Sequence, residues 1–143
     1  QNILLELQKD LHKTIIFITH DLDEALRIGD NIAILRDGKI IQKGDPQQII
    51  MKPADDYISD FIKDINRGKV IEVKSIMQKG SSKGTSLDSS CSLEDALKVL
   101  NNEKNNECSV VDDKGKKIGK VTLDAAIGAL FREKASRNKE KYK

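Results

Sequence analysis

The feature that most restricts the fold is an unbroken apolar and β-branched run at residues 14–19, which read TIIFIT. A strand with one face in water alternates apolar and polar residues, whereas a strand covered on both faces is apolar throughout. The run therefore predicts a central strand of a parallel sheet. Because parallel strands are joined by crossover connections that are usually helical, this prediction places the first part of the chain in the α/β class.

Local signals predict the elements around this run. Asp21 is a suitable N-cap for a short helix that ends at Gly29. The Asp37-Gly38 pair tolerates positive φ, which suits a tight turn between two antiparallel strands. The remaining expected elements are a helix around Leu4–Leu11, a helix capped by Asp45 with Pro46 in its first turn, and an amphipathic helix carrying Ile58, Phe61, Ile62 and Ile65.

Composition and charge change near residue 67. Residues 1–66 carry a net charge of −4 and residues 67–143 a net charge of +6. Residues 67–84 are expected to form a linker, and 85–132 to run in the order short strand, helix, strand, strand, helix. Residues 133–143 are basic and nearly without apolar side chains, so they are expected to form a flexible tail. The sequence thus predicts an α/β part followed by a small α+β domain.

Several classes of protein are disfavoured by composition. The longest apolar runs are far shorter than the ~20 residues that a membrane-spanning helix needs. Cys91 and Cys108 lack CxxC spacing and have no histidine nearby, so neither a zinc site nor a disulfide framework is expected. Aromatic residues make up 3% of the chain, too few for a nucleic-acid stacking surface, so nucleic acid is not an expected partner. The chain starts at Gln1 without a secretory signal, and this start resembles a cut in a longer protein.

A distinctive run of residues surrounds His20. Residues 19–25 read THDLDEA, residues 30–40 read DNIAILRDGKI, and Gly-Asp-Pro follows at 44–46. This run resembles the histidine-switch region of ABC transporter ATPases. More narrowly, DLDEALRIGD at 21–30 and PADDYISDF at 53–61 resemble the ATPases of glycine betaine/proline (osmoprotectant) importers. This resemblance implies that residues 1–66 are the C-terminal part of an ABC-type P-loop ATPase domain.

The resemblance also implies a catalytic role for His20. It places the imidazole at the γ-phosphate of ATP, bound with Mg²⁺ in the complete protein, whereas Asp21 and Glu24 are better explained as a helix cap and a solvated face. The sequence contains no G-x-x-x-x-G-K-[ST] loop, signature motif or Walker B motif. The 143-residue chain alone is therefore expected to be inactive as an ATPase.

The expected partners follow from the same resemblance. They are a second copy of the subunit, transmembrane permease subunits and, through the complex, a solute-binding protein. The implied location is cytoplasmic, at the inner face of the cell membrane.

The element order of residues 85–132 is similar to one CBS repeat. The nucleotide motif of such repeats reads approximately G-h-h-[ST]-x-x-[DN], and residues 119–125 here read GKVTLDA. Thr122 is thus the candidate ligand of an adenine nucleotide. Because Ala125 stands at the carboxylate position, the alternative that Thr122 is a structural N-cap is favoured. A lone repeat also suggests pairing with a second copy of the chain.

Taken together, the residues favour a segment of the ATP-hydrolysing subunit of a compatible-solute importer, with a CBS-like regulatory module. Two alternatives stay open. The chain could be a non-catalytic CBS regulatory or dimerisation module, or it could belong to an ABC importer for another solute. The sequence does not identify the solute, because solute choice lies in other subunits.

Overall fold

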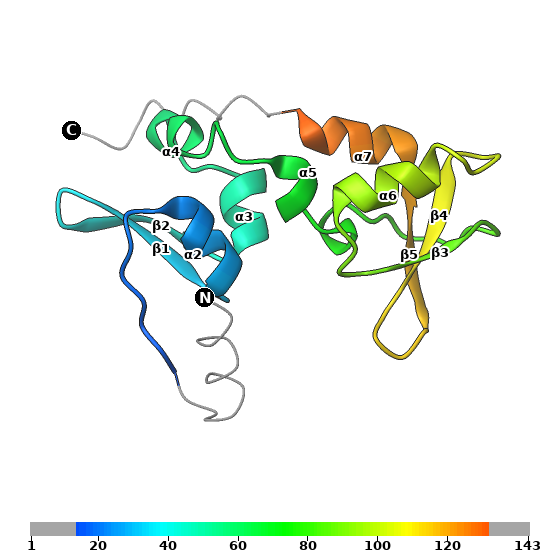
Figure 1. The fold of residues 1–143 in the computed structure, drawn as a ribbon, viewed down its shortest axis with the longest axis horizontal. Coiled ribbons are helices and arrows are strands. Elements are labelled where there is room, and N and C mark those ends of the chain that lie inside the picture. Colours follow the sequence, from blue (N-terminus) through cyan, green and yellow to red (C-terminus); the bar gives the residue numbers. More distant parts are fainter. Residues whose placement is uncertain (1–13, 132–143) are drawn as a thin grey trace.

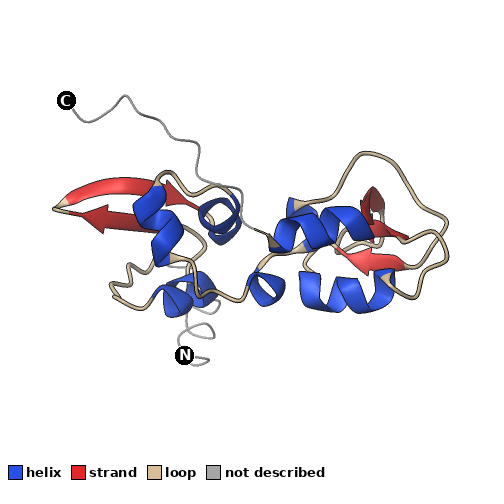
Figure 2. Ribbon diagram, turned by 90° about the horizontal axis from the view of Figure 1, so that it is seen from above, coloured by secondary structure: helices blue, strands red, loops and turns tan. Residues whose placement is uncertain are grey.

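The computed structural model describes residues 14–131, which form two lobes along one long axis (Figures 1 and 2). The first lobe contains α2 (Leu22–Ile28), β1 (Ile32–Arg36), β2 (Lys39–Gly44), α3 (Pro46–Met51) and α4 (Asp56–Phe61). The second contains η1 (Val73–Ser75), β3 (Ser86–Asp88), α6 (Leu93–Leu100), β4 (Glu107–Val111), β5 (Lys117–Thr122) and α7 (Leu123–Leu130). The one-turn helix α5 (Arg67–Val70) lies between the lobes.

Two sequence predictions lie outside the described residues: the helix around Leu4–Leu11 and the flexible tail at 133–143. Within the described range, every helix is too short or too polar to cross a lipid bilayer.

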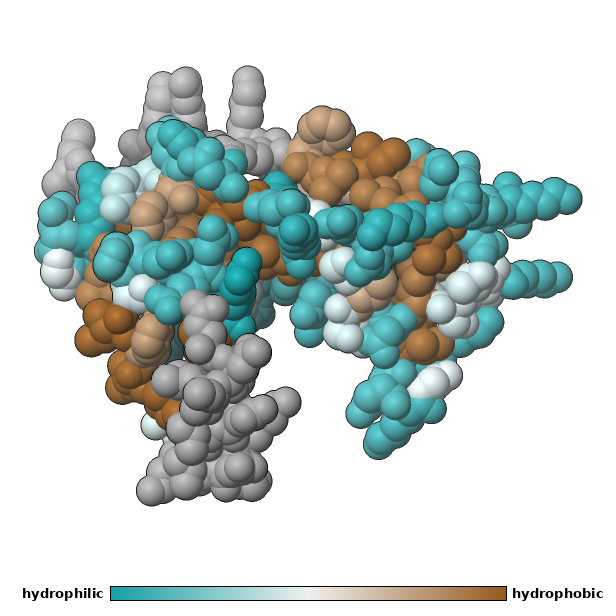
Figure 3. All heavy atoms as spheres, in the orientation of Figure 1, coloured by the Kyte–Doolittle hydropathy of each residue, from teal (hydrophilic) through white to brown (hydrophobic). Residues whose placement is uncertain are grey.

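The central strand predicted at residues 14–19 is not formed. Ile16 and Ile18 are 86% and 91% exposed, and the segment forms an apolar strip on the surface in Figure 3. A strand needs neighbours that accept and donate its backbone hydrogen bonds. In residues 14–131, β1 pairs only with β2, and the other three strands pair among themselves, so no strand pairs with this segment. The prediction of a buried strand is therefore wrong for this structure.

The local signals of the first lobe are confirmed. The side chains of Asp21 and Asp45 accept hydrogen bonds from the backbone N–H groups in the first turns of α2 and α3. Asp37 and Gly38 have φ angles of 51° and 75°, as a tight hairpin turn between β1 and β2 requires. The helix predicted to contain Ile58 is present as α4, although it ends at Phe61.

The second lobe has the predicted element order, and its sheet runs β3-β4-β5. β3 is parallel to β4, and β4 is antiparallel to β5. Ser92 and Thr122 cap α6 and α7, which pack against each other. The inward side chains are fully buried, among them Leu93, Leu100, Val110 and Val121.

The helix α5 was not expected from the sequence, which predicted a linker over residues 67–84. Asn66 caps it, and Gly68 is buried in its first turn. A Cβ at Gly68 would lie 3.6 Å from Leu130 Cδ2, an ordinary van der Waals distance, so α5 and α7 lie within side-chain contact of each other here. The buried apolar side chains form one continuous cluster through both lobes. The division into domains at 1–66, 67–84 and 85–132 stays a prediction.

Gly128 in α7 offers a direct test of this packing. A Cβ at Gly128 would meet no atom within 4 Å, so alanine fits without strain. Alanine also has the higher helix propensity, and Gly128→Ala is expected to raise the free energy of unfolding by about 0.5–1 kcal/mol. Urea denaturation followed by circular dichroism measures this change.

Gly119→Ala is the matched control. At Gly119 in β5 a Cβ would lie 2.8 Å from the carbonyl oxygen of Gln78, so this substitution is expected to destabilise the protein. Equal losses of stability in the two variants would contradict the packing described for α7.

Candidate functional site

The loop before α2 presents His20 on a backbone fixed by its neighbours. The Thr19 hydroxyl donates to Glu24 Oε2 at 2.8 Å, and the Asp21 N–H donates to Thr19 Oγ1 at 3.0 Å. The Glu24 N–H in turn donates to Asp21 Oδ1 at 3.2 Å. His20 itself is exposed. The loop therefore holds an imidazole at the surface, where its ring nitrogens can donate to or accept from a bound group.

The same contacts account for the two carboxylates beside His20. Asp21 caps α2, and Glu24 accepts a hydrogen bond from the Thr19 hydroxyl. Both side chains hold the loop in place; the cap at Asp21 is as predicted, whereas Glu24, predicted on a solvated face, is half-buried. Neither needs a catalytic role to explain its position.

The described residues provide little else that would hold a nucleoside triphosphate. No phosphate-binding G-x-x-x-x-G-K-[ST] loop occurs in the sequence. In residues 14–131 there is also no group of three or more His, Cys, Asp and Glu side chains that could hold a metal ion. A role for the exposed His20 in ATP chemistry therefore stays a prediction.

Thr122, the second candidate, lies at the junction of β5 and α7. Its Oγ1 accepts a hydrogen bond from the Ala125 N–H at 3.2 Å, which is the N-cap geometry. Gly119, the other motif residue, faces the carbonyl oxygen of Gln78. Gln78 also forms two backbone hydrogen bonds with Lys120, at 2.8 and 3.0 Å. The contacts of the chain itself therefore explain both motif residues, and a nucleotide at Thr122 stays a prediction.

The side chains near Thr122 include an ion pair and a buried thiol. Lys120 Nζ donates to Glu107 Oε2 at 2.9 Å, and this hydrogen bond lowers the pKa of the Glu107 carboxyl. Burial, followed by the nearby charges of Glu103, Cys91 and Glu107, raises the pKa of the Cys108 thiol to about 11. Near neutral pH the Cys108 thiol is thus protonated, which excludes thiolate chemistry.

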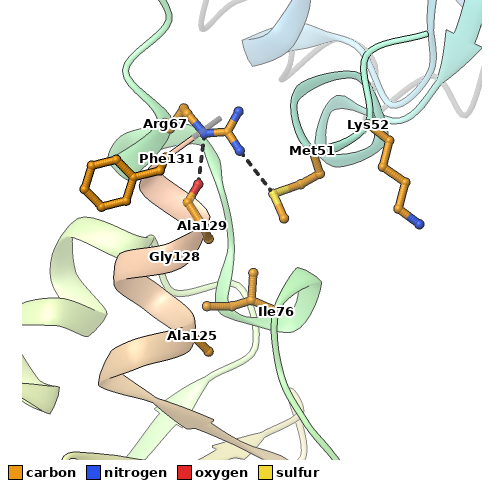
Figure 4. Close-up of a pocket in the computed structure, with 8 residues that line it drawn as sticks. All are labelled: Met51, Lys52, Arg67, Ile76, Ala125, Gly128, Ala129 and Phe131. Carbon is orange, nitrogen blue, oxygen red and sulfur yellow. Dashed lines mark hydrogen bonds between the residues drawn. The ribbon is translucent and has the colours of Figure 1, made fainter. Parts of the chain in front are cut away.

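A pocket of about 180 Å³ lies between the lobes, as Figure 4 shows. Met51 and Lys52 line it from the end of α3, and Ala125, Gly128 and Ala129 line it from α7. No sequence pattern indicated this pocket, because its walls come from separate segments of the chain between Met51 and Phe131. Neither His20 nor Thr122 lines it.

Comparison with known proteins finds extensive similarity to transport ATP-binding proteins. The trimethylamine N-oxide transport system ATP-binding protein TmoW of Pelagibacter ubique is 39% identical over 140 residues, which cover 94% of this chain and 40% of the relative. This chain is a homologue of ABC transporter ATP-binding subunits. The resemblance predicted from the sequence is therefore confirmed, and the similarity extends through both lobes.

Two other ABC relatives have compatible solutes in their names. The glycine betaine/carnitine transport ATP-binding protein GbuA of Listeria monocytogenes is 54% identical over 77 residues, 54% of this chain and 19% of the relative. The glycine betaine/proline betaine protein ProV of Escherichia coli is 35% identical over 133 residues, 93% of this chain and 33% of the relative. The chain thus spans 19–40% of the length of these three relatives.

No family model matches the chain. Among solved structures, the CBS-pair protein CBSX2 of Arabidopsis thaliana is similar at 22% identity, with 76% of this chain and 78% of that chain covered and a TM-score of 0.31. A score this low does not establish a common fold. The CBS-like character of the second lobe therefore rests on its element order.

Proposed function

We propose that this chain is a segment of the ATP-hydrolysing subunit of an ABC importer for glycine betaine/proline-type compatible solutes. The observation that carries the proposal is the 39% identity to TmoW over 94% of the chain. The names of GbuA and ProV support the solute class, because both name glycine betaine. Trimethylamine N-oxide, which TmoW's name gives, is the rival solute from the same chemical group of methylated amines.

In this proposal His20 acts on the substrate ATP, bound with Mg²⁺ in the complete subunit. The imidazole is exposed on a hydrogen-bonded loop, so it is free to contact ATP that other parts of the subunit bind. Phosphoryl transfer depends mainly on positioning and on stabilising charge at the transferring phosphoryl group. A hydrogen bond from His20 to a γ-phosphate oxygen would hold the phosphoryl group in position for the attacking water. It would also stabilise the negative charge on that oxygen.

The partners and the location are part of the same proposal. The complete subunit would work as a pair of copies on permease subunits at the inner face of the membrane, with a solute-binding protein delivering the solute. The second lobe would be a CBS-like regulatory module. Because its Thr122 is occupied as a helix cap, pairing between copies is favoured over adenine-nucleotide binding as the means of regulation.

Solute uptake tests this proposal directly. Proteoliposomes containing the complete transporter are expected to accumulate labelled glycine betaine only when ATP is present on the side of the membrane that the ATPase faces. Competition by unlabelled proline betaine, carnitine and trimethylamine N-oxide then ranks the solutes. ATP-dependent uptake of trimethylamine N-oxide without uptake of glycine betaine would reject the solute class, whereas no ATP-dependent uptake would reject the transport role.

Self-association of the chain is a second testable part. The second lobe exposes three large apolar side chains, with Ile118 at 39%, Ile127 at 41% and Phe131 at 70%. Exposed apolar side chains of this size could be buried in the self-complementary contact of a symmetric dimer. In sedimentation equilibrium the mass of the 143-residue chain is expected to approach twice its 16.0 kDa as concentration rises.

Charged substitutions locate this contact. Ile127→Lys is expected to return the chain to a monomer, and Leu35→Lys, at an exposed position of the first lobe, serves as the matched control. A monomer at every concentration would reject self-association. A dimer that Ile127→Lys leaves intact would exclude this face of α7 as the contact.

A further inference from the structure

Arg67 connects the two lobes through the ends of two helices. Its Nε donates to the carbonyl oxygen of Ala129 at 2.9 Å, and its Nη1 donates to the carbonyl oxygen of Ile50 at 2.9 Å. Its Nη2 also lies 3.6 Å from the Met51 sulfur. Ala129 is in the last turn of α7 and Ile50 in the last turn of α3. Figure 4 shows the guanidinium above the pocket between these elements.

The chemistry of a helix end explains why an arginine suits this place. The last carbonyl groups of a helix have no partner inside the helix, and the helix dipole puts partial negative charge there. A guanidinium carries a positive charge and several N–H groups in a rigid planar fork. One side chain can therefore satisfy two helix ends at once and fix the angle between them.

A second side chain fastens the segment that follows Arg67. Gln47 of α3 donates through Nε2 to the Val70 carbonyl oxygen at 2.8 Å. Its Oε1 accepts hydrogen bonds from the Glu72 N–H and the Ser75 hydroxyl, both at 3.0 Å. Gln47 therefore holds the end of α5 and the residues up to Ser75 of η1 against α3.

We propose that Arg67 is the coupling residue that sets the orientation of the second lobe relative to the first. The fork ties the end of α3 to the end of α7, and a rotation of either lobe would have to break one of the two hydrogen bonds. A change that the second lobe undergoes is thereby passed to the first lobe. The proposal concerns the geometry of the chain and does not depend on its function in transport.

Double electron–electron resonance, which measures the distance between two spin labels, tests the coupling in the full 143-residue chain. Spin labels are attached at Lys43→Cys in β2 and Lys116→Cys before β5, both exposed, with Cys91→Ser to prevent labelling there. The protein with Arg67 is expected to give a single narrow distance peak. Arg67→Ala is expected to lose this peak and give a broad distribution.

Two further variants make the outcome decisive. Arg67→Lys keeps the positive charge but lacks the planar set of guanidinium N–H groups, so it is expected to broaden the distance distribution. This variant replaces Arg67→Ala in the test if Arg67→Ala does not fold. Arg36→Ala, which removes an arginine that stacks on Tyr57 within the first lobe, is expected to keep the narrow peak. A narrow peak in a folded Arg67→Ala or Arg67→Lys protein, or equal broadening in Arg36→Ala, overturns the proposal.

Discussion

Replacing His20 by alanine is expected to lower ATP hydrolysis by the complete subunit roughly 10²-fold or more, as removal of one preorganised donor does in other enzymes. The affinity for ATP is expected to change little. The reason is that a donor aimed at charge that develops during phosphoryl transfer acts on the transition state more than on the bound substrate. Steady-state turnover and equilibrium binding of ATP, measured on the same preparation, separate the two effects.

The loop around His20 supplies graded controls for this experiment. His12→Ala makes the same substitution at the chain's other histidine and is expected to leave turnover near its original value. Thr19→Val removes the hydroxyl that bonds Glu24 and accepts from the Asp21 N–H, so it is expected to give an intermediate loss through poorer positioning of His20. If His20→Ala weakened ATP binding as much as turnover, the proposed role at the γ-phosphate would be wrong.

Local signals in this sequence predicted most of the elements correctly because the interactions behind them are local. The caps at Asp21 and Asp45 and the turn at Asp37-Gly38 each depend on residues within a few positions of one another. The strand predicted at 14–19 is wrong for the opposite reason. Its formation depends on other strands, and none in the described part of the chain pairs with it.

The same distinction applies to the candidate sites. His20 could be found from sequence because the residues on both sides form a recognisable run, and the structure places it on an exposed, hydrogen-bonded loop. At Thr122 the structure shows the hydroxyl in its alternative role as a helix cap, and ligand binding there stays a prediction. Arg67 was missed because its partner Ala129 lies 62 positions away, and no periodicity or motif relates the two residues.

Leu100→Ala is expected to lower the free energy of unfolding by about 2–5 kcal/mol, the range for a leucine removed from a packed core. Leu100 is the last residue of α6 and is completely buried. Its truncation removes apolar contacts and leaves a cavity, while alanine keeps the helix propensity of the position. Urea denaturation followed by circular dichroism measures the change. Leu97→Ala on the same helix, where the side chain is only half-buried, is the matched control and should cost less.

The same variant shows whether the lobes unfold as one unit. The buried cluster is continuous through both lobes, and Arg67 bonds to each of them, so the loss at Leu100 should also destabilise the first lobe. Tyr57 in α4 reports on that lobe by its fluorescence, once Tyr142→Phe has removed the chain's other tyrosine. We expect the urea midpoints from fluorescence and from circular dichroism to shift together. If Leu100→Ala did not change the urea midpoint measured by fluorescence, the lobes would unfold independently. The division into domains predicted from the sequence implies this result.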